Sequence, residues 1–171
     1  MIHVYYGDGK GKTTAAIGLA IRAAGTGMKV CMVRFMKTDQ SGEVEIINQI
    51  ENITLKPCTR SFGFTFQMTP EQKEEARAYY TEMLRETIED KNVAKYDMIV
   101  MDEANIVFYY DLIEKKELLN FLKKYGQSKE IVLTGACKNE ELIQLGDYVT
   151  QIQKIKHPFD KGMDARRGIE Y

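Results

Sequence analysis

The sequence predicts an α/β fold in which helices flank a mainly parallel sheet. Short apolar runs rich in β-branched residues alternate along the chain with longer segments of helical periodicity. Several of these runs are apolar enough to be buried on both faces, as strands of parallel sheets are. Because strand and helix alternate, we expect parallel strands joined by helical crossovers.

The strands are expected in five apolar runs. They cover residues 2–6, 30–35, 96–101, 131–134 and 148–153. The last run alternates apolar and polar residues, so we expect a partly exposed strand there.

The helices are predicted from periodicity and from end signals. Alanines and aliphatic residues fill positions 12–24, and Gly25 and Gly27 mark the end of this helix. The segment Thr-Pro-Glu-Gln at 69–72 is a capping box with proline at the first helical position, so a helix should run from there to about Lys91. Two further helices are predicted at residues 112–125 and 139–145.

The bulk composition bounds the class of protein. The 171 residues fit one domain spanning 1–171, and 44% hydrophobic residues are enough to form a core. A formal net charge of −1 predicts neither nucleic acid nor an anionic membrane as a partner. No leader and no membrane-spanning run is expected, and the three cysteines lack CxxC spacing and are predicted to be reduced thiols. We therefore expect a cytoplasmic protein.

The strongest chemical signal is the loop Gly-Asp-Gly-Lys-Gly-Lys-Thr-Thr at residues 7–14, between the first strand and the first helix. Backbone N–H groups of such a loop cradle phosphate oxygens, and the helix N-terminus adds partial positive charge. Lys12 is expected to reach the phosphates and the Thr13 hydroxyl to ligate Mg²⁺. The loop departs from GxxxxGK[ST] because Tyr6 stands where the first glycine belongs. It predicts a P-loop NTPase-like (RecA-like) fold, and the alternative is a glycine-rich turn without a ligand.

The residues expected to bind the nucleotide are Gly7, Asp8, Gly9, Lys10, Gly11, Lys12, Thr13 and Thr14.

A second half of the site is predicted at the end of the buried run 96–101, where Asp102 and Glu103 follow. One of these carboxylates should hold Mg²⁺ directly or through water. The alternative is a pair of acids that only caps a strand end. Loop and acids together predict nucleotide binding, but they do not decide the reaction.

Several further segments carry a family resemblance. They are RAAG at 22–25, RFMK at 34–37, GFTF at 63–66, MDE at 101–103, LTG at 133–135, KHPF at 156–159 and GIEY at 168–171. This series, in this order, resembles the BtuR/CobA-type ATP:cob(I)alamin (corrinoid) adenosyltransferases over nearly the whole chain. The variant loop GxGKGKTT and the closing segments are its most specific parts.

The resemblance implies that a reduced corrinoid, as Co(I), attacks C5′ of ATP and that inorganic triphosphate leaves. It implies an enzyme of the cob(I)yrinic acid a,c-diamide or corrinoid adenosyltransferase type, with ATP and a reduced corrinoid as substrates. Thr13 and Glu103 are then the expected Mg²⁺ contacts, with Asp102 in support and Mn²⁺ as an alternative metal. Arg22 matches a family arginine that meets the nucleotide, although a solvated helix residue is an equal alternative.

Two aromatic residues, Phe64 and Phe66, match the family's GFxW segment. There they would form an apolar wall that excludes a lower axial ligand from cobalt, and with Lys12 they are the predicted catalytic residues. Two core phenylalanines are the alternative. His157 matches a family segment but is also explained by positioning the C-terminal tail.

The resemblance also implies partners and shows departures. It suggests a reduced flavoprotein as electron donor, cobalamin or a precursor as the corrinoid, and a homodimer. Arg34 replaces the usual glutamine, Phe66 the usual tryptophan and Ala136 the usual arginine, for which Lys138 is a candidate substitute. The sequence begins almost on its first strand, so we expect the N-terminal extension of many family members to be missing.

Two other functions stay open from sequence. One is an ordinary ATPase or kinase that uses Glu103 to orient water or a hydroxyl. The other is a non-enzymatic, ATP-dependent corrinoid carrier or sensor. Their products differ, because hydrolysis gives ADP and phosphate, adenosyl transfer gives triphosphate, and a carrier gives neither.

Overall fold

The computed structural model describes residues 1–37, 41–63 and 65–170. Within these ranges six strands form one sheet, in which every neighbouring pair is parallel, in the order β3-β2-β4-β5-β1-β6. The strands are β1 (Ile2–Tyr6), β2 (Val30–Arg34), β3 (Ile53–Leu55), β4 (Met98–Asp102), β5 (Glu130–Gly135) and β6 (Tyr148–Gln151). The predicted α/β fold with a parallel sheet is confirmed.

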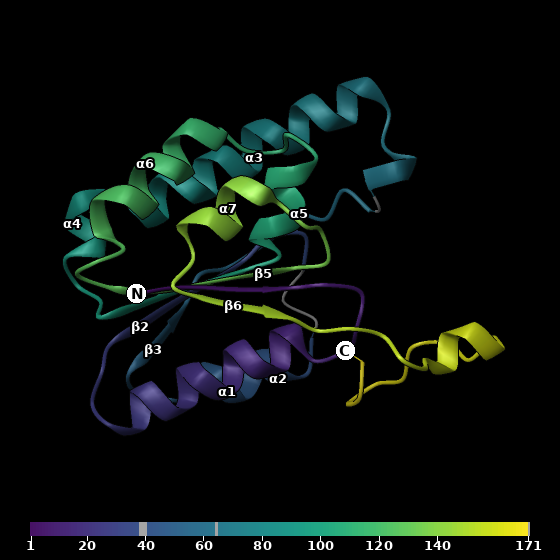
Figure 1. The fold of residues 1–171 in the computed structure, drawn as a ribbon, viewed down its shortest axis with the longest axis horizontal. Helices are drawn as coiled ribbons and strands as arrows, with labels where there is room; N and C mark the ends of the chain where they lie inside the picture. Colours follow the sequence, from purple (N-terminus) through teal and green to yellow (C-terminus); the bar gives the residue numbers. More distant parts are fainter. Residues whose placement is uncertain (38–40, 64, 171) are drawn as a thin grey trace.

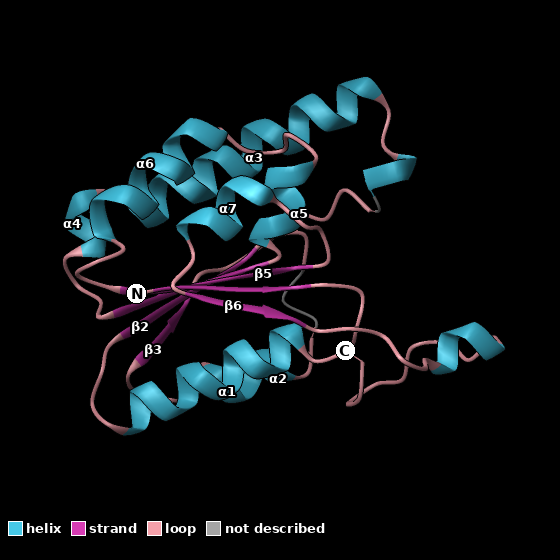
Figure 2. Cartoon of the chain, in the orientation of Figure 1, coloured by secondary structure: helices cyan, strands magenta, loops and turns pink. Residues whose placement is uncertain are grey.

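Helices cover both faces of this sheet (Figure 1). On one face lie α1 (Lys12–Gly25) and α2 (Glu43–Ile47). On the other face lie α3 (Pro70–Ile88), α4 (Asp90–Val93), α5 (Ala104–Tyr109), α6 (Lys115–Tyr125) and α7 (Glu140–Leu145). Two short 3₁₀ turns, η1 (Thr65–Gln67) and η2 (Pro158–Lys161), lie outside these layers (Figure 2).

The two faces of the sheet are packed differently. Beneath the sheet, the alanines Ala16 and Ala20 of α1 are fully buried against Met32 and Val100. Small side chains let this helix approach the strands closely, which fixes the position of its first turn. Above the sheet, larger residues such as Tyr80 and Leu84 of α3 fill the core.

Some predicted boundaries differ from the structure. The helix expected to reach Lys91 ends at Ile88, because Glu89 takes an extended conformation (φ −58°, ψ 128°) and caps a new short helix. The helix expected from residue 112 begins at Lys115, since Leu112 and Ile113 are buried as part of the preceding turn. The short elements β3, α2 and α5 carry too few residues for a periodic signal, and the sequence did not predict them.

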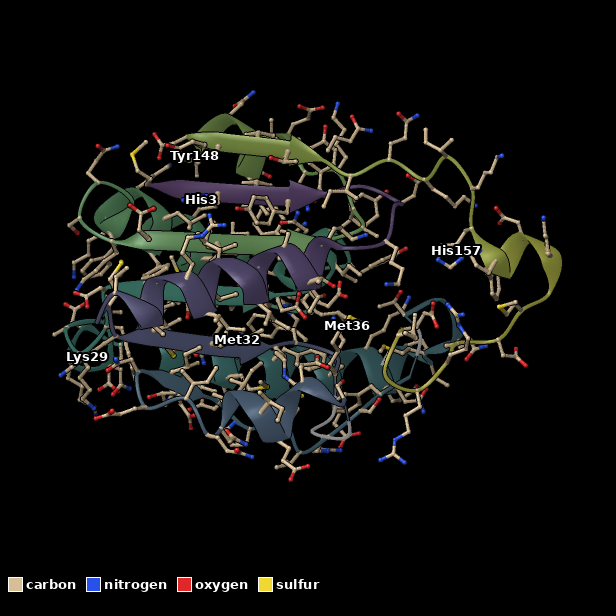
Figure 3. The ribbon with its side chains drawn as sticks, turned by 90° about the horizontal axis from the view of Figure 1, so that it is seen from below. His3, Lys29, Met32, Met36, Tyr148 and His157 are labelled. Atoms are coloured by element: carbon tan, nitrogen blue, oxygen red, sulfur yellow. The ribbon has the colours of Figure 1, made fainter. Side chains whose placement is uncertain are left out.

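The carboxyl ends of all the strands meet at one edge, because the sheet is parallel. Figure 3 shows Met36 at this edge, beyond the end of β2, and Lys29 at the opposite edge. Two segments project beyond the carboxyl edge, one carrying η1 and one being the C-terminal arm, residues 152–170 (Figure 1). In the described part of the chain, no helix is long and apolar enough to cross a membrane.

Candidate nucleotide and metal site

The phosphate loop connects the carboxyl end of β1 to the first turn of α1. Gly11, the residue before the helix, has φ +116°, a conformation that strongly favours glycine. The Lys12 ammonium folds back and donates to the Gly9 carbonyl oxygen at 2.6 Å. The predicted phosphate-binding residues therefore stand at the amino end of a 14-residue helix, as an anion site requires.

A second contact explains why the loop needs glycines early in its sequence. The Gly9 N–H donates to the Ile152 carbonyl oxygen at 2.8 Å, and the backbone N–H of Lys154 donates to Asp8 Oδ1 at 2.9 Å. A Cβ at Gly7 would overlap the Ile152 carbonyl oxygen, and one at Gly9 would lie 2.8 Å from the same atom. The segment after β6 thus packs directly on the loop, and Asp8 is used to anchor it.

Asp102, at the end of β4, is the most enclosed acid of the site, with 0% of its surface exposed. The Thr13 hydroxyl donates to its Oδ1 at 2.9 Å, and the Thr134 hydroxyl from β5 donates to the same oxygen. The Lys37 ammonium donates to Oδ2 at 2.7 Å. Three donors, one of them a cation, thus compensate for the burial of this carboxylate.

Lys37 joins all the predicted metal ligands. Its ammonium nitrogen lies 2.7 Å from Thr13 Oγ1, 2.7 Å from Asp102 Oδ2 and 3.3 Å from Glu103 Oε1. Lys37 follows Met36, which has φ +61°, a value uncommon outside glycine. This turn directs the chain from β2 toward the end of β4.

Glu103 also has a left-handed backbone, with φ +62°, and its N–H donates to Thr134 Oγ1 at 3.0 Å. Its side chain is 18% exposed. Oε2 of this carboxylate is buried, and among the described residues no donor reaches it. The carboxylate is therefore fixed at one oxygen and has an unused acceptor at the other.

The pKa values of the site reflect burial and close opposite charges. Burial raises the pKa of Glu103, and the neighbouring Lys37 opposes this shift. Burial alone would lower the pKa of Lys37, but Asp102 and Glu103 reverse the effect and the pKa is raised. Burial lowers the pKa of Lys12, partly offset by Glu103 and Asp8.

Lys12, Lys37 and Glu103 line one cavity of about 490 Å³, which is within the usual size range of ligand pockets. The lining residues are Lys10, Gly11, Lys12, Thr13, Thr14, Ile17, Lys37, Ser41, Glu43, Glu103 and Glu170. Lys10 and Thr14 thus face the same space as the predicted triphosphate ligands. Glu170 reaches it from the C-terminal arm, and the Arg166 guanidinium lowers the pKa of this carboxyl to about 2.

The donor set fits a magnesium ion. Among the described residues, no group of three or more His, Cys, Asp and Glu side chains forms a metal site by itself. One hydroxyl and one or two carboxylates are nevertheless what Mg²⁺ takes from a protein, because phosphate oxygens and waters complete its shell. The unused Oε2 of Glu103 is an acceptor available for that purpose.

Arg22 lies apart from the other predicted nucleotide ligands. It is exposed near the end of α1, ten positions after Lys12, which corresponds to about 15 Å along a helix. There it borders a separate hollow of about 360 Å³ together with His3 and Glu130. The structure therefore does not bring Arg22 to the phosphate loop.

The predicted aromatic wall consists of Phe64 and Phe66. Phe64 lies outside the described residues, and so does the side chain of Phe66. In the same segment, Phe62 packs against Tyr79 and Tyr80 of α3, with ring centroids 5.9 Å and 5.6 Å apart. This packing anchors the segment that precedes η1.

The C-terminal arm carries His157. Its Nδ1 accepts the Phe159 N–H at 3.2 Å, so the ring caps η2, in line with a role in positioning the tail. Figure 3 shows His157 well outside the sheet, whereas His3 lies on β1. The arm encloses a hollow of about 850 Å³ and leaves Ile155 81% exposed and Phe159 72% exposed.

Arg34 and Ala136, two residues that depart from the family pattern, lie in different surroundings. Arg34 is fully buried at the end of β2, 3.5 Å from Glu43 Oε1, and so supplies charge behind the cavity rather than in it. Ala136 is exposed just beyond β5. Lys138, the candidate substitute for the missing arginine, forms an ion pair with Glu140 at 2.6 Å.

Two residues of the site, Lys37 and Thr134, were not assigned a role from sequence. Their position could have pointed to them, because each lies at or just after the carboxyl end of a buried strand. These two strands, β2 and β5, are the neighbours of β4 in the sheet. Neither residue type is specific enough to single out without the strand order.

Known proteins now identify the chain. Residues 1–171 match the family described as ATP:corrinoid adenosyltransferase BtuR/CobO/CobP. A corrinoid adenosyltransferase of Sinorhizobium sp. is 35% identical over 174 residues, which cover all of this chain and 80% of the relative. The corrinoid adenosyltransferases of Escherichia coli strain K12 and Salmonella typhimurium strain LT2 are 32% and 31% identical, over all of this chain and 85% of each relative.

Among solved structures, the KaiC-like protein PH0186 of Pyrococcus horikoshii superimposes with a TM-score of 0.53 at 12% identity, covering 89% of this chain and 71% of that one. This likeness concerns the fold alone and agrees with the predicted P-loop NTPase-like type. The chain therefore belongs to the ATP:corrinoid adenosyltransferase BtuR/CobO/CobP family and is an enzyme that adenosylates corrinoids with ATP.

Proposed function

We propose that the cavity at the carboxyl edge binds Mg–ATP with its triphosphate in the loop, so that the loop holds a leaving group. The observation that carries this proposal is that Asp102 and Glu103, at the end of β4, meet Thr13 beside the loop, although Thr13 is distant from them in sequence. The reaction then forms a bond between Co(I) and C5′ of ATP and breaks the bond from C5′ to the triphosphate oxygen. The nucleophile is an electron pair on cobalt, so the step needs no general base.

Binding of the triphosphate is assigned to the loop from Gly7 to Thr14. Lys12 and Lys10 supply positive charge, and the amides at the start of α1 donate to phosphate oxygens. Lys12 is free to do so once it leaves the Gly9 carbonyl. Gly9 and Asp8 act mainly by holding the loop to the segment after β6.

Metal binding is assigned to the Thr13 hydroxyl and the Glu103 carboxylate, with Asp102 positioning Thr13. The unused Oε2 of Glu103 supports this assignment. When bound, Mg²⁺ or Mn²⁺ would neutralise charge that grows on the departing triphosphate.

The corrinoid is assigned to the space beyond the carboxyl edge, where the segment with η1 and the C-terminal arm project (Figure 1). Phe64 and Phe66 are proposed to face the corrin and keep a lower axial ligand from cobalt. A reduced flavoprotein is the proposed electron donor, and a homodimer the proposed assembly. Arg22 is proposed to meet the nucleotide only if the ligand extends along α1, since it is remote from the loop.

An anaerobic assay tests the proposed function. Protein, Mg–ATP and chemically reduced cobalamin are mixed, and the light-sensitive Co–C product and triphosphate are measured, with cobinamide as a second corrinoid. Equal amounts of both products are expected. ADP with free phosphate would indicate an ATPase, and ADP without free phosphate a kinase. ATP binding without adenosylated corrinoid, triphosphate or ADP would indicate a carrier or sensor.

A further inference from the structure

The cation nearest to the two proposed metal ligands, Thr13 and Glu103, and to Asp102 beside them is a side chain of the protein itself. The Lys37 ammonium lies within 2.7 Å of oxygens on Thr13 and Asp102 and 3.3 Å from one on Glu103. The Lys12 ammonium, which belongs to the phosphate loop, is bound instead to the Gly9 carbonyl. The acidic pair is therefore neutralised by a lysine that follows β2 and not by the loop lysine.

The backbone around this contact is unusual on both sides. Met36, the residue before Lys37, and Glu103 both have left-handed φ values of 61° and 62°. Such conformations cost free energy in residues other than glycine and persist where the surroundings enforce them. The backbone on both sides of the contact therefore favours the approach of Lys37 to Glu103, which is not a contact between two freely moving surface side chains.

The ammonium and a divalent ion cannot use these oxygens together. Mg²⁺ binds oxygen at about 2.0–2.1 Å, and two cations sharing the same ligands repel strongly in a partly buried site. Lys37 also lines the cavity that contains Lys12 and Thr14. An ATP triphosphate in that cavity brings anionic oxygens to which a displaced ammonium can donate.

We propose that Lys37 is the resident cation of the metal site in the nucleotide-free protein, and that it moves from the carboxylates to the triphosphate when Mg–ATP binds. Lys37 therefore keeps divalent ions out until the nucleotide arrives, and afterwards adds a positive charge to the leaving group. The inference rests on the proposed metal ligands Thr13 and Glu103. It assigns Lys37 a role of its own, first as a counter-ion of the carboxylates and then as a contact of the triphosphate.

The test measures Mn²⁺ binding to the nucleotide-free protein by electron paramagnetic resonance. Replacing Lys37 by methionine removes the resident charge, so Mn²⁺ should bind at least about tenfold more tightly than to the wild type. Lys10→Met is the matched control, because it removes one lysine charge from the same cavity. No hydrogen bond or ion pair joins Lys10 to either carboxylate in the part of the chain described, and its effect should stay below about threefold.

Thermal unfolding supplies a second readout. Without divalent ions, Lys37→Met should melt at a lower temperature than the wild type, because two buried carboxylates lose their counter-charge. Added Mn²⁺ should raise the melting temperature of the variant but not that of the nucleotide-free wild type. If Lys37→Met does not fold alone, Lys37→Gln keeps a donor to Asp102, and Mn²⁺ present during refolding should rescue either variant.

The outcomes separate this inference from the proposed function. A folded Lys37→Met or Lys37→Gln protein that binds Mn²⁺ no more tightly than the wild type overturns the role of Lys37. A variant that Mn²⁺ does not rescue on refolding overturns it as well. If the wild type binds Mn²⁺ no better with ATP than without it, the proposed metal ligands themselves are wrong.

Discussion

The phosphate-loop site and the C-terminal arm lie at the same edge of the sheet but are built in opposite ways. At the loop, Asp102 is fully buried and receives hydrogen bonds from Thr13, Thr134 and Lys37. In the arm, Phe159 is 72% exposed. Beyond its anchor on the phosphate loop, the arm has exposed contacts within itself, such as the ion pair of Lys154 with Asp160 at 2.9 Å. Exposed pairs of this kind contribute little to stability.

The difference indicates that the phosphate-loop site is rigidly preformed, whereas the C-terminal arm is not. The proposed nucleotide site is positioned by core strands, so its geometry exists before a ligand binds. The arm has apolar side chains without comparable packing. Substitutions in the arm should therefore change ligand affinity and not the free energy of unfolding.

Lys12→Ala should give the largest effect. The rate of triphosphate formation should fall by about 10²–10³-fold, because one preorganised cation for the leaving group is lost. Single-turnover assays with reduced cobalamin measure this rate, and circular dichroism checks the fold. A near-normal rate in a folded variant would show that Lys12 does not act on the triphosphate.

Gly9→Ala tests the contact between the loop and the segment after β6. The new methyl would lie 2.8 Å from the Ile152 carbonyl oxygen, so the free energy of unfolding should fall by about 1–3 kcal/mol. Urea unfolding measures it. Gly18→Ala in α1 is the control, because its Cβ meets nothing within 4 Å and helix propensity should stabilise the protein by about 0.5–1 kcal/mol. Equal effects at both positions would contradict the close approach seen at the loop.

Phe66→Ala addresses the proposed corrinoid wall. Corrinoid turnover should fall about tenfold, equivalent to ~1.4 kcal/mol of transition-state stabilisation, with the Kd of ATP unchanged. Phe62→Ala is the comparison variant, since Phe62 packs on Tyr79 and Tyr80 and its loss should lower stability instead. An ATP affinity that fell in step with turnover would place Phe66 at the nucleotide.

Phe159→Ser should change stability least. The free energy of unfolding should shift by less than about 0.5 kcal/mol, because the ring is mostly exposed. Leu84→Ala in α3, fully buried, should cost about 2–5 kcal/mol in the same urea experiment. A large loss for Phe159→Ser would mean that the arm packs more firmly in solution than its exposure suggests.

The sequence predicted well where a signal is local. The capping box at the start of α3 is confirmed, because the Thr69 hydroxyl accepts the Gln72 N–H and the Gln72 side chain accepts the Thr69 N–H. The first strand and the first helix are also found where expected, since glycines, alternation and periodicity all agree there.

The sequence failed where the answer depends on packing between distant segments. Lys37 reaches Asp102 only because β2 and β4 are neighbours, and no local pattern states that order. Glu89, with its extended backbone, interrupts a run that looks helical throughout in the sequence.

The place of β1 between β5 and β6 has a consequence for how the protein is made. The strand that carries the phosphate loop is synthesised first, but both of its neighbours and the Ile152 carbonyl that holds Gly9 are synthesised last. Contacts between residues so far apart form late and slowly in folding. On the ribosome, a nascent chain that already carries the whole loop is therefore expected to complete the contacts of that loop only after β6 has emerged.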